Sequence, residues 1–279
     1  MPNFQTYMGV TTSLKGGGGK STLACALLDN IRHKNTPVAA FDADGSVGSL
    51  IDMHGLRDDD GYLLHDQDPR KGVSGYNIRD DTRTELFESL GNQDCFILHD
   101  VAGGALGDLQ RVLSDADDGL RDFFRGLQAQ NACIVFMHLI TPDRSTVESL
   151  AMHMDITDQL GSTAAGDLGI HGRHIAVLNR HGHRKDQDFP HWFGYVDTKG
   201  VERGGKTRKR LLEAGGAEMD LPALSDRTMA LVKELQIPFR LAVHDPRISL
   251  TDQQKVSIFC EKFDAAMSPK VRGLLGLPS

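Results

Sequence analysis

Residues 13–22 read SLKGGGGKST, and this stretch decides the fold. Its end, Gly19-Lys20-Ser21, matches the end of the phosphate-binding pattern G-x-x-x-x-G-K-[ST]. The first glycine of that pattern would fall at residue 14, which is Leu14, and the next residue is a second lysine, Lys15. Residues 13–22, called the glycine loop below, are therefore either a defective phosphate loop or a variant with two lysines.

The flanking sequence has the context that a phosphate site needs. The apolar run Tyr7–Thr12 predicts a buried strand that enters the loop, and the amphipathic run Ser21–Lys34 predicts a helix that leaves it. Four consecutive glycines let backbone N–H groups approach a phosphate closely, and the helix N-terminus adds partial positive charge. The residues predicted to bind a nucleotide here are Gly16, Gly17, Gly18, Gly19, Lys20, Ser21 and Thr22.

The chemistry of these side chains suggests a role for each. Lys20 would contact the β- and γ-phosphates, the Ser21 hydroxyl would ligate Mg²⁺, and Thr22 would reach the α-phosphate. From Lys15 to Thr22 the loop resembles the deviant Walker A motif K-G-G-x-G-K-[ST]-T of the ParA/MinD family of ATPases. The resemblance implies that Lys15 is the signature lysine, which acts across an ATP-dependent homodimer on the partner's nucleotide. The variant with two lysines is thus the preferred interpretation.

Two further apolar runs end in carboxylates. The run VAAFDAD ends with Asp42 and Asp44, and CFILHD ends with Asp100. Parallel sheets bind ligands at the carboxyl ends of their strands, so these aspartates are expected beside the loop. Asp100 resembles a Walker B residue that holds Mg²⁺. Resemblance to the family's D-x-D segment implies that Asp44 positions or activates the attacking water, with Asp42 supporting the metal shell.

The resemblance covers roughly residues 5–180, and it has departures. The segment DVAGG stands where the family often has D-[TL]-P, and Gly-Ser follows Asp44 where Pro-Gln is usual. The later run HIAVLN ends with Asn179, and an Asn at this place in the family pairs with adenine. A guanine-reading N-K-x-D motif would need Asp at position 182, which is Gly182, so ATP is favoured over GTP. The predicted cofactors are ATP and Mg²⁺.

Short apolar runs alternate with amphipathic stretches along the chain. This alternation predicts an α/β fold with a mostly parallel sheet, helices on both faces, and a single P-loop ATPase domain over residues 1–279. Two stretches, His54–Asp81 and His181–Leu221, lack regular patterns and are predicted to be long surface insertions. The predicted strands are Tyr7–Thr12, Val38–Phe41, Cys95–Leu98, Cys133–Ile140, His174–Leu178 and Phe239–Val243.

A second letter-level match to the phosphate-loop pattern is Gly200–Thr207. The run before it, near Tyr195 and Val196, is short and polar, so a basic surface loop is the preferred interpretation. The same region holds the densest basic run, KTRKR. Its candidates for sequence-independent, salt-sensitive DNA contacts are Lys206, Arg208, Lys209 and Arg210, with a solvated loop as the alternative.

Composition excludes several other classes. The net charge of −7 provides no global attraction to nucleic acid or acidic lipid. The four cysteines form no C-x-x-C motif, which is typical of free thiols in a reducing compartment. We find no signal-peptide pattern and no membrane-length apolar run. The C-terminal SPKVRGLLGLPS is too short and too rich in Pro and Gly to favour membrane anchoring. A bacterial cytoplasmic protein, with association to the nucleoid as an option, is expected.

Together these features predict an ATPase that dimerises on ATP and hydrolyses it to drive partition or positioning of plasmid DNA, chromosomal DNA or another cargo. Slow hydrolysis, stimulated by a centromere-binding or adaptor protein, is expected from the family resemblance. Two alternatives remain open. One is a membrane-cycling, MinD-like positioning ATPase, and the other is a metabolic enzyme on the same fold, such as an ATP-dependent ligase.

Overall fold

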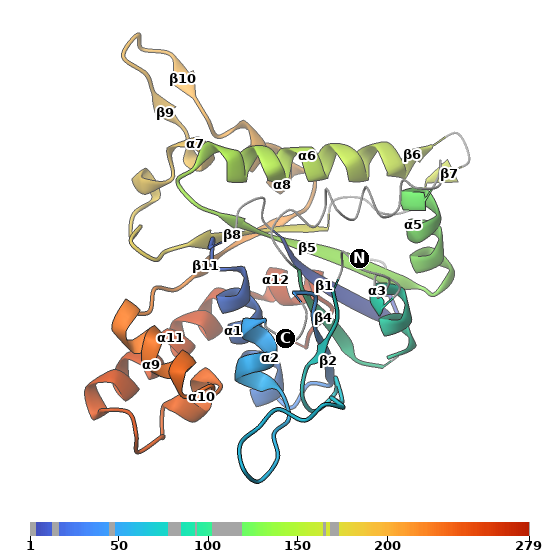
Figure 1. Ribbon diagram of the computed structural model, residues 1–279. Coiled ribbons are helices and arrows are strands. Elements are labelled where there is room, and N and C mark those ends of the chain that lie inside the picture. Colours follow the sequence, from blue (N-terminus) through green and yellow to red (C-terminus); the bar gives the residue numbers. More distant parts are fainter. Residues whose placement is uncertain are drawn as a thin grey trace.

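The computed structural model describes residues 4–12, 17–44, 48–77, 85–92, 94–101, 119–163, 166–167 and 173–278. Its centre is a sheet with strand order β11-β8-β5-β1-β4-β2-β3, in which every neighbouring pair is parallel (Figure 1). The strands are β1 (Thr6–Thr12), β2 (Val38–Asp42), β3 (Ser74–Gly75), β4 (Phe96–Asp100), β5 (Ala132–Ile140), β8 (His174–Asn179) and β11 (Ala217–Leu221). The predicted parallel α/β sheet is confirmed.

The central strands are buried on both faces because alternate side chains enter different cores. Along β5, Cys133 and Val135 join the core that contains α1, whereas Ile134 and Phe136 join the core that contains α5. This burial explains why the run reads as almost continuously apolar, without polar alternation.

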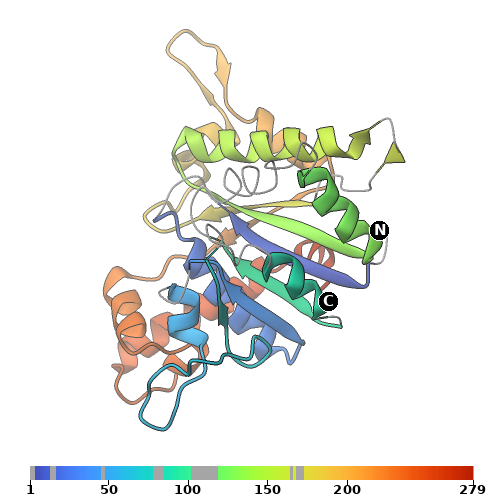
Figure 2. The same ribbon diagram turned by 45° about the vertical axis from the view of Figure 1, so that its right-hand side comes forward.

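Helices cover both faces of the sheet (Figures 1 and 2). One face packs against α1 (Lys20–His33), α2 (Ser49–His54), α9 (Asp226–Glu234), α10 (Phe239–Ala242), α11 (Leu250–Ala266) and α12 (Pro269–Leu274). The other packs against α3 (Glu85–Glu88), α5 (Gly119–Ala129), α6 (Arg144–Gly161), α7 (Pro190–Phe193) and α8 (Lys206–Glu213). Smaller elements are the 3₁₀ turns Ser89–Gly91 and Asp186–Asp188 and the hairpins β6–β7 (Ser162–Thr163, Gly166–Asp167) and β9–β10 (Tyr195–Val196, Glu202–Arg203).

The predicted strand Phe239–Val243 is wrong, because Phe239–Ala242 forms the short helix α10. Pro238 lies at its N-cap, and Phe239 and Ala242 are buried three residues apart while Leu241 is 63% exposed. Burial at a spacing of three is the pattern of a helix. Five residues, four of them apolar, are too short a run to reveal that period, since Leu241 reads as another core residue.

The stretch His181–Leu221, predicted to be a surface insertion, contains an edge strand as well as surface elements. Its last five residues form β11, which pairs in parallel with β8. Ala217, Met219 and Leu221 are buried, whereas Glu218 and Asp220 are half-buried. This alternation of period two was present in the sequence but was hidden by the basic and glycine-rich residues before it.

The C-terminal segment packs into the core beside β1. Val271, Leu274, Leu275 and Leu277 are all buried within the apolar cluster that includes α1 and α11. These four are the apolar side chains that a membrane-binding helix would have to present to a bilayer. No helix in the described part of the chain is long and apolar enough to cross a membrane.

Candidate nucleotide site

The glycine loop ends in a helix start that carries no side-chain cap. The N-cap of α1 is Gly19, in the left-handed conformation with φ 95° and ψ 14°, and the described residues provide no side-chain capping hydrogen bond there. Residues that carry a side chain rarely adopt this φ. A Cβ at position 19 would lie 2.8 Å from Nδ2 of Asn179. An uncapped helix N-terminus lined by glycine is a favourable place for an anion. Lys15 and Gly16 lie outside the described residues, so their predicted roles remain predictions.

Asp100 lies where β4 ends, beside the end of β1. The two strands are in register at Thr11 and Asp100, and Thr11 Oγ1 donates to Asp100 Oδ1 at 2.6 Å. The Ser21 side chain also hydrogen-bonds to Asp100. Burial raises the pKa of Asp100, while the hydrogen bonds from Thr11 and Ser21 and the charge of Lys20 act in the opposite direction. The structure therefore brings together Ser21 and Asp100, two of the three residues predicted to hold or support the metal.

Lys20 is the first residue of α1 and is only 7% exposed. Burial lowers the pKa of its ammonium, whereas the negative charges of Asp100 and Asp44 raise it. Long cationic side chains are rarely this buried without negative partners. Lys20 is thus held within reach of the same carboxylates that surround the glycine loop.

Asp42 and Asp44 occupy different environments at the end of β2. Asp42 is 1% exposed, and its carboxylate accepts from the amides of Asp44 (3.2 Å), Leu50 (3.0 Å) and Ile51 (3.1 Å). Burial, together with the charge of Asp100, raises the pKa of Asp42 to about 7 against these three hydrogen bonds. Asp42 therefore anchors the start of α2 beside the site, a positioning role that the sequence did not reveal.

Asp44 is exposed at the same edge of the sheet. Its backbone forms an isolated bridge with Asn77, and the preceding amide, that of Ala43, donates to the carbonyl oxygen of Asp100 at 2.8 Å. Asp44 thus follows a residue bonded to Asp100, and its predicted role toward the attacking water remains a prediction.

Asn179 braces the glycine loop. Its Nδ2 donates to the carbonyl oxygen of Gly18 at 2.9 Å, and its Oδ1 accepts from the amide of His181 at 3.0 Å. The predicted adenine contact would therefore compete with an interaction that fixes the loop.

A cavity of about 170 Å³ lies between Asn179 and the end of β11. The residues that line it beyond the glycine loop come from the end of β8, the end of β11, the segments that follow these strands, and α9, and most were missed by sequence reasoning. They are Asn179, His181, Leu221, Pro222, Leu224, Asp226 and Met229. The missed residues could have been found by recognising the alternation in β11, because its carboxyl end must meet the same sheet edge as the other strands.

The predicted DNA-contacting residues lie on α8, away from this site. Arg208 donates twice to Glu218 (2.6 and 2.8 Å), and Arg210 bridges Asp155 (2.6 Å) and Asp158 (2.7 Å) on α6. The Lys209 ammonium lies 3.8 Å from Glu213. The two arginines thus hold α8 to its neighbours and do not form a free basic surface.

The chain is similar in structure to several solved proteins. These include MinD cell division protein of Aquifex aeolicus (15% identity, TM-score 0.47, covering 94% of this chain and 99% of that one). They also include the septum site-determining protein MinD of Pyrococcus horikoshii with Mg-ADP (19%, 0.45, 95% and 98%) and the McdA–ATP complex of Cyanothece (13%, 0.46, 99% and 98%). No protein-family model and no curated protein matches the sequence. Likeness at this level assigns no activity, so functional inference rests on the side chains described above.

Proposed function

We propose that this protein is an ATPase that binds Mg-ATP at the glycine loop and uses it to switch between monomer and dimer. The observation that carries the proposal is the meeting of Ser21, Asp100 and Lys20 at an uncapped glycine helix start. A hydroxyl, a carboxylate and an ammonium in this arrangement are the groups that hold a magnesium nucleotide in P-loop enzymes.

The side chains fit a magnesium site that relies partly on the nucleotide. Within the described residues, no group of three or more His, Cys, Asp or Glu could hold a metal. Mg²⁺ is commonly bound by one or two protein oxygens together with phosphate oxygens and water, so Ser21 and Asp100 suffice as protein ligands. When bound, the ion supplies positive charge that stabilises the charge developing on the phosphates.

The remaining groups would position and orient. The amides of the first turn of α1 and the Lys20 ammonium would hold the phosphates. Asp44 would accept a hydrogen bond from the attacking water, and Asp42 would keep the start of α2 in place beside it. Lys15 would act on the nucleotide of the partner subunit, a role supported by its position directly before four glycines.

The switch is proposed to serve partition or positioning of a large cargo through a separate adaptor protein. The ion pairs of Arg208 and Arg210 remove two of the four predicted DNA-contacting residues on α8 from any free basic surface. With a net charge of −7, a second protein is better suited than α8 to recognise DNA. Burial of the C-terminal apolar residues disfavours the membrane-cycling alternative.

The test is size-exclusion chromatography with light scattering in Mg-ATP and in ADP, together with ATP turnover. The wild type is expected to dimerise in Mg-ATP and to be monomeric in ADP. Lys20→Ala should fail to bind nucleotide, whereas Lys15→Ala should bind ATP and remain monomeric. Lys209→Ala, on a distant helix, is the control and should match the wild type. A wild type that stays monomeric in Mg-ATP would overturn the switch and would favour a metabolic enzyme whose turnover needs a small-molecule substrate.

A further inference from the structure

His99 is a buried polar residue directly beside the nucleotide site. It precedes Asp100 in β4, and its side chain is 0% exposed. Successive side chains of a strand point to opposite faces of a sheet. Asp100 accordingly bonds to Ser21 on the face of α1, whereas His99 contacts Tyr76 and Ser89 on the other face. His99 is thus next to the site in sequence while its ring packs on the opposite side of the sheet.

The hydrogen bonds around His99 have one consistent direction. The single hydroxyl hydrogen of Ser89 goes to the carbonyl oxygen of Leu86 at 2.8 Å, so Ser89 Oγ accepts from Nε2 of His99 at 3.0 Å. Burial lowers the pKa of His99 to about 3, so the ring is neutral and its Nδ1 is an acceptor. Tyr76 Oη donates to this Nδ1 at 3.0 Å. Tyr76, His99 and Ser89, called the His99 network below, therefore pair each of their side-chain hydrogens with an acceptor.

Aromatic contacts fix the plane of the imidazole. Phe41 stacks on the His99 ring with centroids 4.8 Å apart and planes within 12°, and Tyr76 meets it edge to face at 5.7 Å. In the sheet, β2 lies between β4 and β3, so the bond from Tyr76 to His99 spans β2 beside Phe41. Hydrogen bonds in a buried network specify direction, which apolar packing alone does not. The network therefore sets where Tyr76 lies relative to β4.

The segment that carries Tyr76 has little support from the sheet itself. It follows β3, an edge strand of two residues that pairs only with β2 among the described strands. The amide of Tyr76 donates to the carbonyl oxygen of Asp42 at 2.9 Å, and the next residue, Asn77, forms the isolated bridge with Asp44. The hydroxyl of Tyr76 thus ties to β4 the piece of backbone that lies against Asp44.

We propose that His99 is a positioning residue for ATP hydrolysis: through the segment that begins at Tyr76, it fixes the place of Asp44. The inference rests on the proposed function, in which Asp44 orients the attacking water. His99 and Asp100 are consecutive in β4, so the His99 network holds the water-orienting carboxylate in register with the carboxylate that would hold Mg²⁺. It has no part in holding the nucleotide itself, whose predicted ligands lie with α1 on the other face.

The experiment is single-turnover hydrolysis of ATP by the full chain, together with titration of a fluorescent ADP analogue in the presence of Mg²⁺. Tyr76→Phe removes the bond to His99 and keeps the ring. Its hydrolysis rate should fall about tenfold, because small displacements of a water-orienting group are costly, while its affinity for the analogue should change by less than about twofold. His99→Leu should behave in the same way. His99→Gln should retain most of the rate, because its amide can accept from Tyr76 and donate to Ser89.

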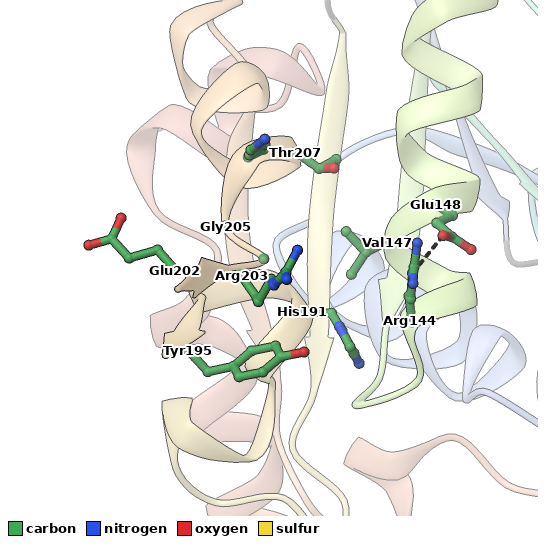
Figure 3. A pocket seen from close by; sticks show the side chains of 11 residues that line it. Arg144, Val147, Glu148, His191, Tyr195, Glu202, Arg203, Gly205 and Thr207 are labelled. Carbon is green, nitrogen blue, oxygen red and sulfur yellow. Dashed lines mark hydrogen bonds and ion pairs between the residues drawn. The ribbon is translucent and has the colours of Figure 1, made fainter. Parts of the chain in front are cut away.

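Two control variants separate positioning from stability. Thr157→Val also takes a buried hydroxyl from a buried imidazole, since Thr157 Oγ1 lies 3.0 Å from Nε2 of His174 on β8, which two strands separate from β4. It should lower the denaturant midpoint much as Tyr76→Phe does and leave the hydrolysis rate unchanged. Tyr195→Phe makes the same chemical change at the surface, where Tyr195 meets the ring of His191 edge to face at 5.9 Å (Figure 3). It should change neither the midpoint nor the rate.

Three results would overturn the inference and leave the proposed ATPase standing. A rate in Tyr76→Phe equal to that of the wild type would show that the network does not position Asp44. An equal loss of rate in Thr157→Val would show that the effect is one of stability. A loss of rate in Tyr76→Phe that matches a loss of affinity for the ADP analogue would assign the network to nucleotide binding. A wild type that binds the analogue and does not hydrolyse ATP would instead refute the proposed ATPase, and the role of His99 with it.

Discussion

Asn179 at the end of β8 donates from Nδ2 to the carbonyl oxygen of Gly18 at 2.9 Å, so one strand end holds the glycine loop from the side. Asn179→Ala would remove this bond and the one to the amide of His181. Asn179→Ala would disturb the geometry of the glycine loop. We therefore expect the affinities for ADP and GDP to fall together, by roughly tenfold. Titration with fluorescent analogues of both nucleotides measures the two affinities. A fall for ADP alone would show that Asn179 reads the base.

The hydrogen bond from Thr11 to Asp100 is expected to contribute to both stability and metal binding. Thr11→Val removes the donor and leaves a buried carboxylate less well solvated, so the free energy of unfolding should fall by about 1.5–3 kcal/mol. The same change raises the pKa of Asp100, so the loss should be largest at high pH, where the carboxylate is ionised, and should shrink as the pH falls.

Urea unfolding with and without Mg-ADP is the measurement for Thr11→Val, and stabilisation by the nucleotide should shrink in the variant. The control is Thr6→Val at the other end of β1, which is similarly buried and has no side-chain hydrogen bond within the described residues. An equal loss in Thr6→Val would mean that Thr11 acts only through packing.

Gly48 is expected to tolerate no side chain, for a reason of space alone. Its φ of −78° suits any residue, but a Cβ would overlap the carboxylate of Asp42, which holds the start of α2. Gly48→Ala should therefore destabilise the protein by about 1–3 kcal/mol. Gly126→Ala is the matched control, because Gly126 lies inside α5 with no atom within 4 Å of an added Cβ, and it should stabilise by about 0.5–1 kcal/mol. The measurement is the denaturant midpoint of each variant. Equal changes in midpoint for Gly48→Ala and Gly126→Ala would refute the predicted overlap.

Three buried histidines lie on the face of the sheet that packs against α6, and they predict that the protein is sensitive to acid. His138 Nε2 and His174 Nδ1 are 2.9 Å apart, His174 Nε2 meets Thr157 Oγ1 at 3.0 Å, and the rings of His138 and His153 lie 4.8 Å apart. Burial lowers the pKa of His174 to about 3 and of His153 to about 4, and it lowers the pKa of His138 as well. These side chains are neutral in the fold and gain protons on unfolding.

The sign follows from these lowered pKa values. Stability is fully present above the ordinary histidine pKa of about 6.5 and is lost as the pH falls below it. Between pH 7.5 and pH 5.5 each of the three histidines should lower the free energy of unfolding by about 1.4 kcal/mol. His153→Leu should remove the contribution of one histidine to this pH dependence. The measurement is the difference in unfolding free energy between the two pH values. An unchanged dependence would place the acid sensitivity in other groups.

Much of the site could be predicted from sequence because a parallel sheet gathers its strand ends. Once Asp44, Asp100 and Asn179 were placed at strand ends, their position beside Lys20 and Ser21 followed from topology. The wall formed by Leu221, Pro222 and Leu224 was missed because the strand before it is short and half polar. The anchoring role of Asp42 could not be predicted either. It depends on the tertiary structure, which places the amides of Leu50 and Ile51 beside the Asp42 carboxylate.

The other errors have one physical cause. Contacts between residues that lie far apart in the sequence leave no pattern in the local sequence. The basic run on α8 reads as a free patch, yet Arg210 meets Asp155 and Asp158 more than fifty residues away. Phe239 was assigned to a strand because the four apolar residues among the five from Phe239 to Val243 carry no clear period. Burial and counter-charge in these places are supplied by the tertiary structure.

The central position of β1 has a kinetic consequence. Both of its neighbours come from much later in the chain, since Tyr7 is paired with Phe96 on one side and Cys133 on the other. The loop entropy of these crossovers must be overcome before any pairing stabilises the strand, so folding of such topologies is slow. The bond between Thr11 and Asp100 can form only once that closure is complete. We therefore expect nucleotide to act on refolding mainly by slowing escape from the native state, with little effect on the rate of reaching it.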